Sequence, residues 1–166
     1  MISWLFIGLV ATILLTPGPT NTLLASSGVQ VGFRKSAKLI PAEVLGYIIS
    51  ISAWGMLIGK VSATLPFLPP MLKLLSACYI IFLAIKLWHT ANQQFELDQP
   101  TIRPRELFCA TLLNPKALLF ASAIFPVTAW TDFHIYLIHM LAYLALITPI
   151  ALFWIFLGSI LAANKV

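Results

Sequence analysis

The stretch 14-LLTPGPTNTLL-24 interrupts an apolar run that otherwise has the character of one long helix. Pro17 and Pro19 have no backbone N–H, so the carbonyls of Ile13 and Leu15 lose their regular helical partners. In water such a break would simply be a loop. At membrane depth, irregular backbone is tolerated only where it is buried in protein or lines a water-filled cavity. What the break means therefore depends on the solvent around it.

Composition identifies that solvent as lipid. The 166 residues are 60% hydrophobic and 9% charged, with a mean hydropathy of +0.97, whereas soluble proteins are roughly 45–50% apolar and about 25% charged. Apolar surface this abundant cannot all be buried within one small globule. We therefore expect an all-α integral membrane protein. Cys78 and Cys109 have no metal-binding or redox spacing and are expected to be ordinary small residues.

A helix needs about 20 mainly apolar residues to cross roughly 30 Å of hydrocarbon. Segments of this kind predict five spans, at residues 2–27, 39–59, 71–88, 107–130 and 135–163. The last segment is longer than required, and Thr148-Pro149 offers a place for it to bend.

Basic residues near the span ends predict the orientation. If the spans alternate, one side of the membrane receives seven of them: Arg34, Lys35, Lys38, Lys86, Arg103, Arg105 and Lys165. Only Lys60 and Lys73 fall on the other side. This asymmetry predicts an external N-terminus, and it explains the net charge of +5 without nucleic acid as a partner.

The chain also contains a weak internal repeat. "LLTPGP" near the end of the first span is echoed by "LLNPKA" near the start of the fourth, and the two prolines, Pro17 and Pro115, are 98 residues apart. The same offset places 39–59 within the fifth span and 71–88 beyond residue 166. We expect an incomplete three-plus-three repeat with inverted halves, a plan common in secondary transporters. Its parts are a first three-helix repeat (1–88), a cytoplasmic linker (89–106) and a second repeat missing its third helix (107–166).

The segments "TPGPTNTLLASSGVQVGFRKS", "AEVLGY" and "LLNPKALLFASAIFP" resemble the LysE/RhtB family of amino-acid exporters. The resemblance covers residues 4 to 160. It implies a bacterial inner-membrane protein of about six spans that moves amino acids or related metabolites outward, driven by the proton gradient. The sequence stops where the last helix of the family should begin. A truncated, non-transporting paralogue or assembly partner is therefore the alternative expectation.

The first break is the predicted substrate site. Thr16, Thr20 and Asn21 could hold the carboxylate of an amino acid at the positive end of a new half-helix. The freed carbonyls of Ile13 and Leu15 could hold its ammonium. Pro17, Gly18 and Pro19 form the break itself. The alternative is a packing kink in which small residues allow close helix contact.

The second break adds Asn114, Pro115 and Lys116 to the predicted site, as N-cap, N1 and N2 of the main part of the fourth span. A lysine in a first helical turn opposes the helix dipole. It either extends to the inner membrane surface or meets an anion, which could be the substrate carboxylate or Glu43.

Glu43 is the predicted proton-coupling residue, because it is the one carboxylate clearly inside a predicted span. Desolvation disfavours its charged form and a nearby lysine favours it, so the group could load and release a proton. The alternative is an interfacial acid beside Lys38. His139 is a second titratable candidate, but an interfacial or hydrogen-bonded histidine is the simpler interpretation.

These residues predict a transporter and no enzyme, since no nucleophile–base set, metal cluster or phosphate-binding loop is visible. The expected partners are the lipid bilayer, an amino-acid-like substrate, protons and further copies of the chain in a homo-oligomer. No cofactor or metal is expected.

Overall fold

The computed structural model describes residues 2–61, 64–68, 70–72, 74–75, 77–78, 81–82, 85 and 101–163. These residues form helices and connecting loops, so the predicted all-α class is confirmed. Two helices are long and apolar enough to cross a membrane, and two bent helix pairs raise the number of candidate spans to as many as four. Half of the predicted span 71–88 and most of the linker 89–106 lie outside the described residues.

The first predicted span is two helices that meet at the Pro-Gly-Pro break. α1 (Trp4–Leu15) begins after Ser3, whose hydroxyl accepts a hydrogen bond of 3.1 Å from the N–H of Phe6. α2 (Pro19–Val31) begins with a proline, whose missing N–H would have no helical partner at that position anyway. The pair is bent by 55°, which confirms that the helix is broken here.

The fourth predicted span is also broken. α6 (Pro104–Leu112) begins inside the predicted linker, and α7 (Pro115–Leu119) follows after a two-residue interruption, with the pair bent by 42°. Asn114 caps α7, since its Oδ1 accepts a hydrogen bond of 3.0 Å from the N–H of Lys116. The predicted N-cap and N1 positions are therefore confirmed. α7 continues into a π-helical turn, Phe120–Ile124.

The remaining two spans are unbroken. Gly32, with φ 78°, turns the chain after α2 in a conformation that favours glycine. α3 (Phe33–Ser36), a 3₁₀ turn (Ala37–Leu39) and α4 (Ile40–Val61) then follow without a gap. A second 3₁₀ turn (Val127–Trp130) precedes α8 (Phe133–Ala163), which continues through Pro149 as one helix.

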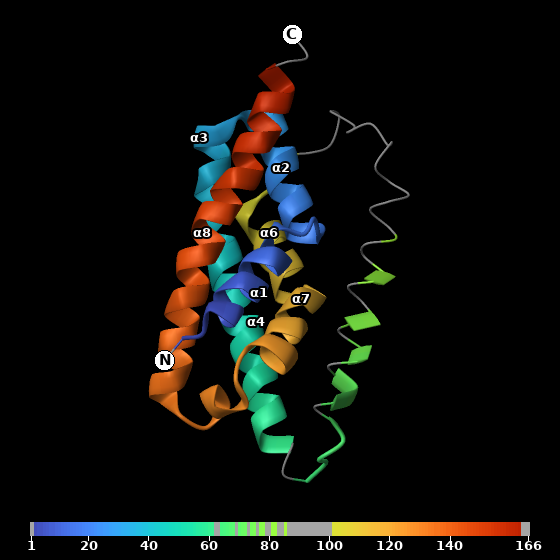
Figure 1. Ribbon diagram of the computed structural model, residues 1–166. Helices are drawn as coiled ribbons and strands as arrows, with labels where there is room; N and C mark the ends of the chain where they lie inside the picture. Colours follow the sequence, from blue (N-terminus) through green and yellow to red (C-terminus); the bar gives the residue numbers. More distant parts are fainter. Residues whose placement is uncertain are drawn as a thin grey trace.

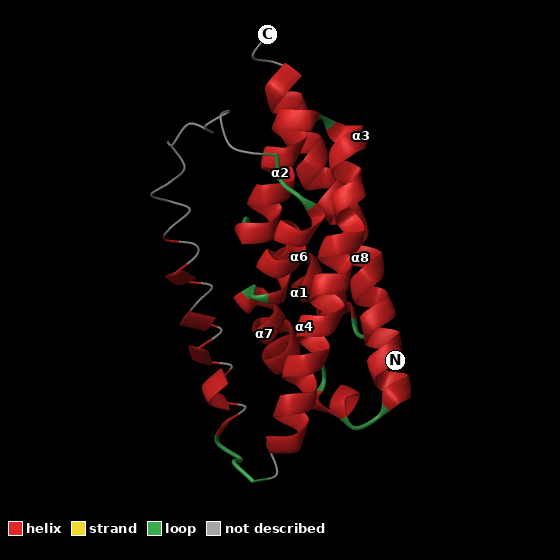
Figure 2. Ribbon diagram, turned by 180° about the vertical axis from the view of Figure 1, so that it is seen from behind, coloured by secondary structure: helices red, strands yellow, loops and turns green. Residues whose placement is uncertain are grey.

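The helices form one bundle in which the two broken pairs run in opposite directions (Figures 1 and 2). In Figure 1, α1–α2 and α8 run upward, whereas α4 and α6–α7 run downward. This arrangement is the one that inverted halves require. The three-plus-three repeat stays a prediction, because half of its third helix lies outside the described residues.

Glycines let the helices approach closely where they cross. A Cβ on Gly28 of α2 would collide with the carbonyl oxygen of Ile155, and one on Gly158 of α8 would collide with that of Ala25. At the crossing of α4 and α6, a Cβ on Gly46 would lie 2.8 Å from the Cβ of Thr111. Small residues at such contacts are typical of membrane helix pairs.

Candidate functional site

The break between α1 and α2 frees backbone carbonyls that two side chains then satisfy. Asn21, from the first turn of α2, donates from Nδ2 to the carbonyls of Leu14 at 2.7 Å and Thr16 at 3.0 Å. Lys116, from α7, donates from Nζ to the carbonyl of Ile13 at 2.9 Å and also to that of Thr16. A buried carbonyl left without a partner costs about 1–3 kcal/mol. The two side chains therefore hold the break in its bent form.

Lys116 reaches this position through the interior of the protein. Its side chain is only 3% exposed, so the interpretation in which it extends to the membrane surface is wrong. Gly18 makes room for it, because a Cβ at that position would lie 3.0 Å from Cε of Lys116 and 3.1 Å from Nζ. The ammonium on the freed carbonyls is thus supplied by the protein itself.

Beside the break, three polar side chains from three elements form a hydrogen-bonded triangle. Asn114 donates from Nδ2 to the Tyr47 hydroxyl at 2.9 Å and to the Thr20 hydroxyl at 3.4 Å. The hydroxyls of Thr20 and Tyr47 lie 3.4 Å apart. All three residues are buried. The triangle joins α2, α4 and the cap of α7 at one point.

Two buried polar atoms next to the triangle have no hydrogen-bond partner within the described part of the chain. Glu43 is 1% exposed and its Oε2 accepts no hydrogen bond, although its carboxyl interacts with the side chain of Thr20 and the charge of Lys116. The hydroxyl of the fully buried Tyr143, on α8, is also unpartnered, and its ring packs edge-on against Tyr47 with the centroids 5.9 Å apart. An interfacial Glu43 does not fit this burial.

The second break is held by a neutral group. Ser50 of α4 donates from its hydroxyl to the carbonyl of Leu112, the last residue of α6, at 2.8 Å. Thr111 turns its hydroxyl back to the carbonyl of Leu107 in its own helix, also at 2.8 Å. No described side chain of this break contributes a charge to its own carbonyls.

Comparison with known proteins identifies the family. Residues 11–165 match the family described as LysE type translocator. The chain belongs to the LysE-type translocators. It is 29% identical over 110 residues to the cysteine/O-acetylserine efflux proteins of Escherichia coli strain K12 and of Shigella flexneri serotype 5b. That match covers 64% of this chain and 54% of each relative, so the chain spans about half the length of the curated relatives it matches. No solved structure gives a significant match.

In this LysE-type translocator most of the predicted site residues come together around the two breaks. The residues buried in one polar cluster are Gly18, Thr20, Asn21, Glu43, Asn114 and Lys116. Thr16 is half-buried, and its hydroxyl bonds the Thr12 carbonyl of its own helix. Pro17 is half-buried and Pro19 is exposed. These prolines interrupt the helix, but they lie at the edge of the polar cluster.

The details of the first break differ from the expectation. The carbonyls bound by side chains are those of Ile13, Leu14 and Thr16, whereas the expected pair was Ile13 and Leu15. Asn21 of α2 and Lys116 of α7 reach the carbonyls of Leu14 and Thr16 across the 55° bend. The side chain of Leu15 is exposed.

Sequence reasoning did not assign three further residues to the polar cluster: Tyr47, Ser50 and Tyr143. Tyr47 and Ser50 follow Glu43 by four and seven residues and so lie on the same face of α4. That spacing could have identified them. Tyr143 follows His139 by four residues on α8, but nothing in the sequence indicates that this face meets Glu43.

Proposed function

We propose that this chain exports a small amino acid or a related polar metabolite, such as cysteine or O-acetylserine, in exchange for protons. The observation that carries the proposal is the Glu43 carboxyl, buried where two broken helices meet and with one oxygen unpartnered. An ionisable group at such a depth is expensive and marks ion or substrate pathways. Broken helices near the bilayer midplane are likewise the typical binding elements of secondary transporters.

The polar cluster offers complementary charges to both ends of a zwitterion. The ammonium of Lys116, with the Asn114 amide and the Thr20 hydroxyl, supplies donors for a carboxylate. The unpartnered oxygen of Glu43 supplies an acceptor for an ammonium. The remaining members of the proposed substrate site keep the breaks in shape around these groups: Thr16, Pro17, Gly18, Pro19, Asn21 and Pro115.

Competition at Glu43 would couple the two fluxes. A protonated carboxyl has lost the charge that attracts an ammonium, so substrate leaves when a proton arrives from outside. A deprotonated carboxyl accepts new substrate from the cytoplasm after the proton has left inward. Exchange of one substrate for one proton follows from the two ligands sharing one oxygen.

Substrate would also act on the break itself. Two of the three N–H groups of the Lys116 ammonium bind the carbonyls of Ile13 and Thr16, and a carboxylate that draws the ammonium away from the break takes this donor from them. The end of α1 is then held only by Asn21. Substrate binding thus loosens the joint about which α1 and α2 can move.

Transport by the purified chain in proteoliposomes tests the proposal. A panel of radiolabelled amino acids that includes cysteine and O-acetylserine is measured with an imposed pH gradient, and again after a protonophore collapses it. We expect movement of at least one of them against its concentration gradient, abolished by the protonophore. Movement of none of the panel would favour the alternative, a non-transporting membrane protein.

Orientation and assembly belong to the same proposal. The basic residues support a bacterial inner-membrane location with the N-terminus outside, and reporter fusions at residues 98 and 166 should both report a cytoplasmic position. Large apolar side chains such as Leu45, Met56 and Phe153 are exposed on α4 and α8, and we propose that a homo-oligomer covers part of this surface. Fully active protein that sediments strictly as a monomer would contradict that assembly.

A further inference from the structure

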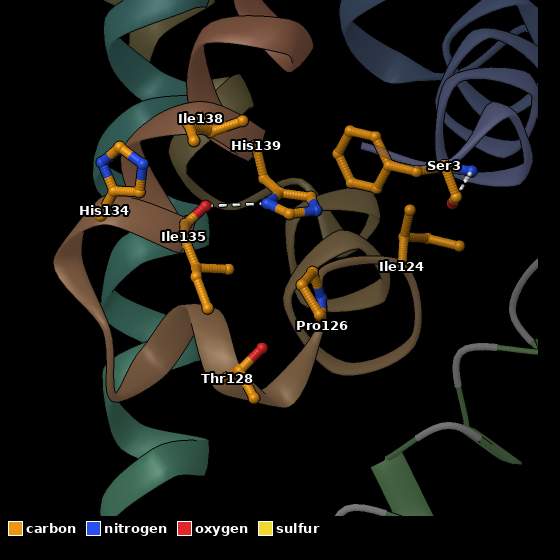
Figure 3. A pocket seen from close by; sticks show the side chains of 9 residues that line it. Ser3, Ile124, Pro126, Thr128, His134, Ile135, Ile138 and His139 are labelled. Carbon is orange, nitrogen blue, oxygen red and sulfur yellow. Dashed lines mark hydrogen bonds between the residues drawn. The ribbon is translucent and has the colours of Figure 1, made fainter. Parts of the chain in front are cut away.

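A cavity of about 400 Å³ lies at the start of α8 (Figure 3), and none of its lining residues belongs to the polar cluster. Its volume is in the lower part of the roughly 300–1,000 Å³ range of small-molecule sites. Three parts of the chain enclose it: the beginning of α1, the segment around the second 3₁₀ turn, and α8. Its polar lining residues are Ser3, Thr128, His134 and His139, and the ring of Phe6 also lines it.

His139 presents a hydrogen-bond acceptor to this cavity. Its Nδ1 lies 2.8 Å from the carbonyl oxygen of Ile135, which can only accept, so Nδ1 carries the hydrogen. In the neutral ring the other nitrogen, Nε2, is therefore an acceptor. Figure 3 shows Nε2 on the side of the ring away from Ile135. The interpretation of His139 as a hydrogen-bonded histidine fits, but the residue also lines a space large enough for a ligand.

The lining indicates the kind of ligand. Within the described part of the chain it includes no Asp, Glu, Lys or Arg. Its polar groups are two histidines, a threonine and a serine, and the rest of its surface is apolar. A small molecule without net charge suits such a lining, with an ammonium donating to Nε2 of His139 and a carboxylate at the open mouth of the cavity, where water reaches it.

An aromatic layer separates this cavity from the polar cluster. Phe6 packs edge-on against His139 with the ring centroids 4.9 Å apart, and against Phe125 at 5.5 Å. Phe125 in turn lies 6.2 Å from the ring of Tyr143, a member of the cluster. Phe6 and Phe125 are both buried. The two phenylalanines thus fill the space between the cavity and the cluster.

Phe125 directly follows the π-helical turn Phe120–Ile124. Its N–H donates to the carbonyl of Phe120 at 2.8 Å, which closes the π-helical turn, and its own backbone is extended. Such π-helical turns are rare and occur frequently at functional sites. A change of this turn would move the Phe125 ring out of the layer while leaving α4 and α8 in place.

We propose that the cavity is an outer substrate site on the export path, which takes a small zwitterionic amino acid, and that Phe6 and Phe125 close the path between it and the polar cluster. The inference rests on the proposed function and on the predicted orientation, which puts the start of α8 outside. The substrate leaves the cluster, passes the layer and rests against His139 before it is released.

Thiol labelling from outside the cell tests the site. In a background that carries Cys78→Ser and Cys109→Ser, Thr128→Cys is treated with a membrane-impermeant thiol reagent, with and without O-acetylserine. We expect labelling that O-acetylserine slows several-fold. Phe133→Cys is the control, because Phe133 is exposed near the same end of α8 but does not line the cavity. It should label at the same rate with or without O-acetylserine.

The outcomes separate this inference from the proposed function. Labelling of Thr128→Cys that O-acetylserine does not slow, in a protein that still exports O-acetylserine, overturns the outer site alone. Wild-type protein that exports no member of the panel defeats the proposed function instead. Thr128→Cys that reacts only with reagent applied from the cytoplasmic side overturns the external position of the cavity.

Downhill leak tests the aromatic layer. Phe125→Ala should raise the protonophore-insensitive leak of O-acetylserine from proteoliposomes several-fold, and Phe133→Ala should leave it unchanged. Phe125→Leu keeps most of the apolar volume and serves if the alanine variant does not fold, with a smaller rise expected. A leak equal to wild type in the folded variants would show that Phe125 does not close the path.

Discussion

The two broken helices of the bundle bind their freed backbone carbonyls with different kinds of side chain. At the break between α1 and α2, freed carbonyls are bound by the Asn21 amide and the Lys116 ammonium. At the break between α6 and α7, the Leu112 carbonyl is bound by the Ser50 hydroxyl. Among the described residues, a charged side chain therefore binds carbonyls of the first break, and none binds those of the second.

The charge in the first break is supplied by the second. Lys116 follows Pro115, the proline that interrupts the other helix, and its ammonium crosses to the end of α1. The two breaks are thus tied to each other, and any group that attracts Lys116 away loosens α1. In the proposed mechanism, substrate can draw the Lys116 ammonium away from these carbonyls, whereas the hydrogen bond from the Ser50 hydroxyl involves no charged group.

Lys116→Met should have the largest effect of the changes that probe this comparison. Met keeps the apolar length of the side chain but leaves the Ile13 carbonyl without a donor and Glu43 without its cation. We expect a loss of roughly 2–5 kcal/mol in the free energy of unfolding and no measurable transport. Denaturation in detergent measures the first quantity. Lys60→Met, at an exposed position of α4, is the control, and an equal effect of both changes would refute the special position of Lys116.

Asn21→Ala should cause the second-largest loss in the free energy of unfolding. The change removes two hydrogen bonds, but Thr16 keeps its bond from Lys116, so one carbonyl, that of Leu14, is left without a partner. The expected loss of unfolding free energy is about 1–3 kcal/mol. A loss smaller than that of Ser50→Ala would contradict the idea that the first break depends more strongly on its side chains.

Ser50→Ala tests the second break by itself. It leaves the Leu112 carbonyl unpartnered, with an expected loss of about 1–2 kcal/mol in the free energy of unfolding. Transport should retain its dependence on the pH gradient, because no charge changes. Ser159→Ala is the comparison, since Ser159 is half-buried and bonds only a carbonyl of its own helix. Ser159→Ala should lose less free energy of unfolding than Ser50→Ala.

Gly18→Ala is expected to be the smallest change in stability. The new Cβ would lie 3.0 Å from Cε of Lys116. Because the end of this flexible side chain can shift slightly, we expect a loss of about 1 kcal/mol or less in the free energy of unfolding. Transport should fall further than this figure suggests, because the ammonium is displaced from the break. Gly8→Ala has nothing within 4 Å of its Cβ and should stabilise α1 by up to about 1 kcal/mol. Opposite signs for the two glycines would support the account, and equal signs would weaken it.

The sequence could predict the breaks but not the partners of the freed carbonyls. Pro17, Pro19 and Pro115 interrupt helices for reasons that are local to the chain, and Asn114 caps the next helix by a contact two residues away. The bond between Lys116 and Ile13 joins residues 103 positions apart. Only the folded bundle, which brings the Lys116 side chain to the end of α1, creates it, and no local rule contains that information.

The same limit applies to the rest of the site. The position of Glu43 within a span identified it as an unusual acid, but its burial depends on helices from both halves of the chain. Tyr143 was missed because a tyrosine in an apolar helix is ordinary until its hydroxyl is found buried without a partner. The cavity beside His139 forms between the beginning of α1 and the segment 124–139, which are far apart in sequence, so it could not be predicted from either one alone.

Transport by Glu43→Gln tests the central claim most directly. Gln keeps the size of the side chain and an oxygen that accepts from an ammonium, but it carries no charge and cannot bind and release a proton. Uphill export of O-acetylserine is compared in proteoliposomes under a fixed pH gradient, beside wild type and Glu106→Gln, a control at an exposed carboxyl that caps α6. We predict that Glu43→Gln loses uphill export at every substrate concentration. Exchange between equal pools, which needs no proton, should survive but require more substrate, because a neutral amide attracts an ammonium less strongly, while Glu106→Gln behaves as wild type. Uphill export by Glu43→Gln at the wild-type rate would contradict the account.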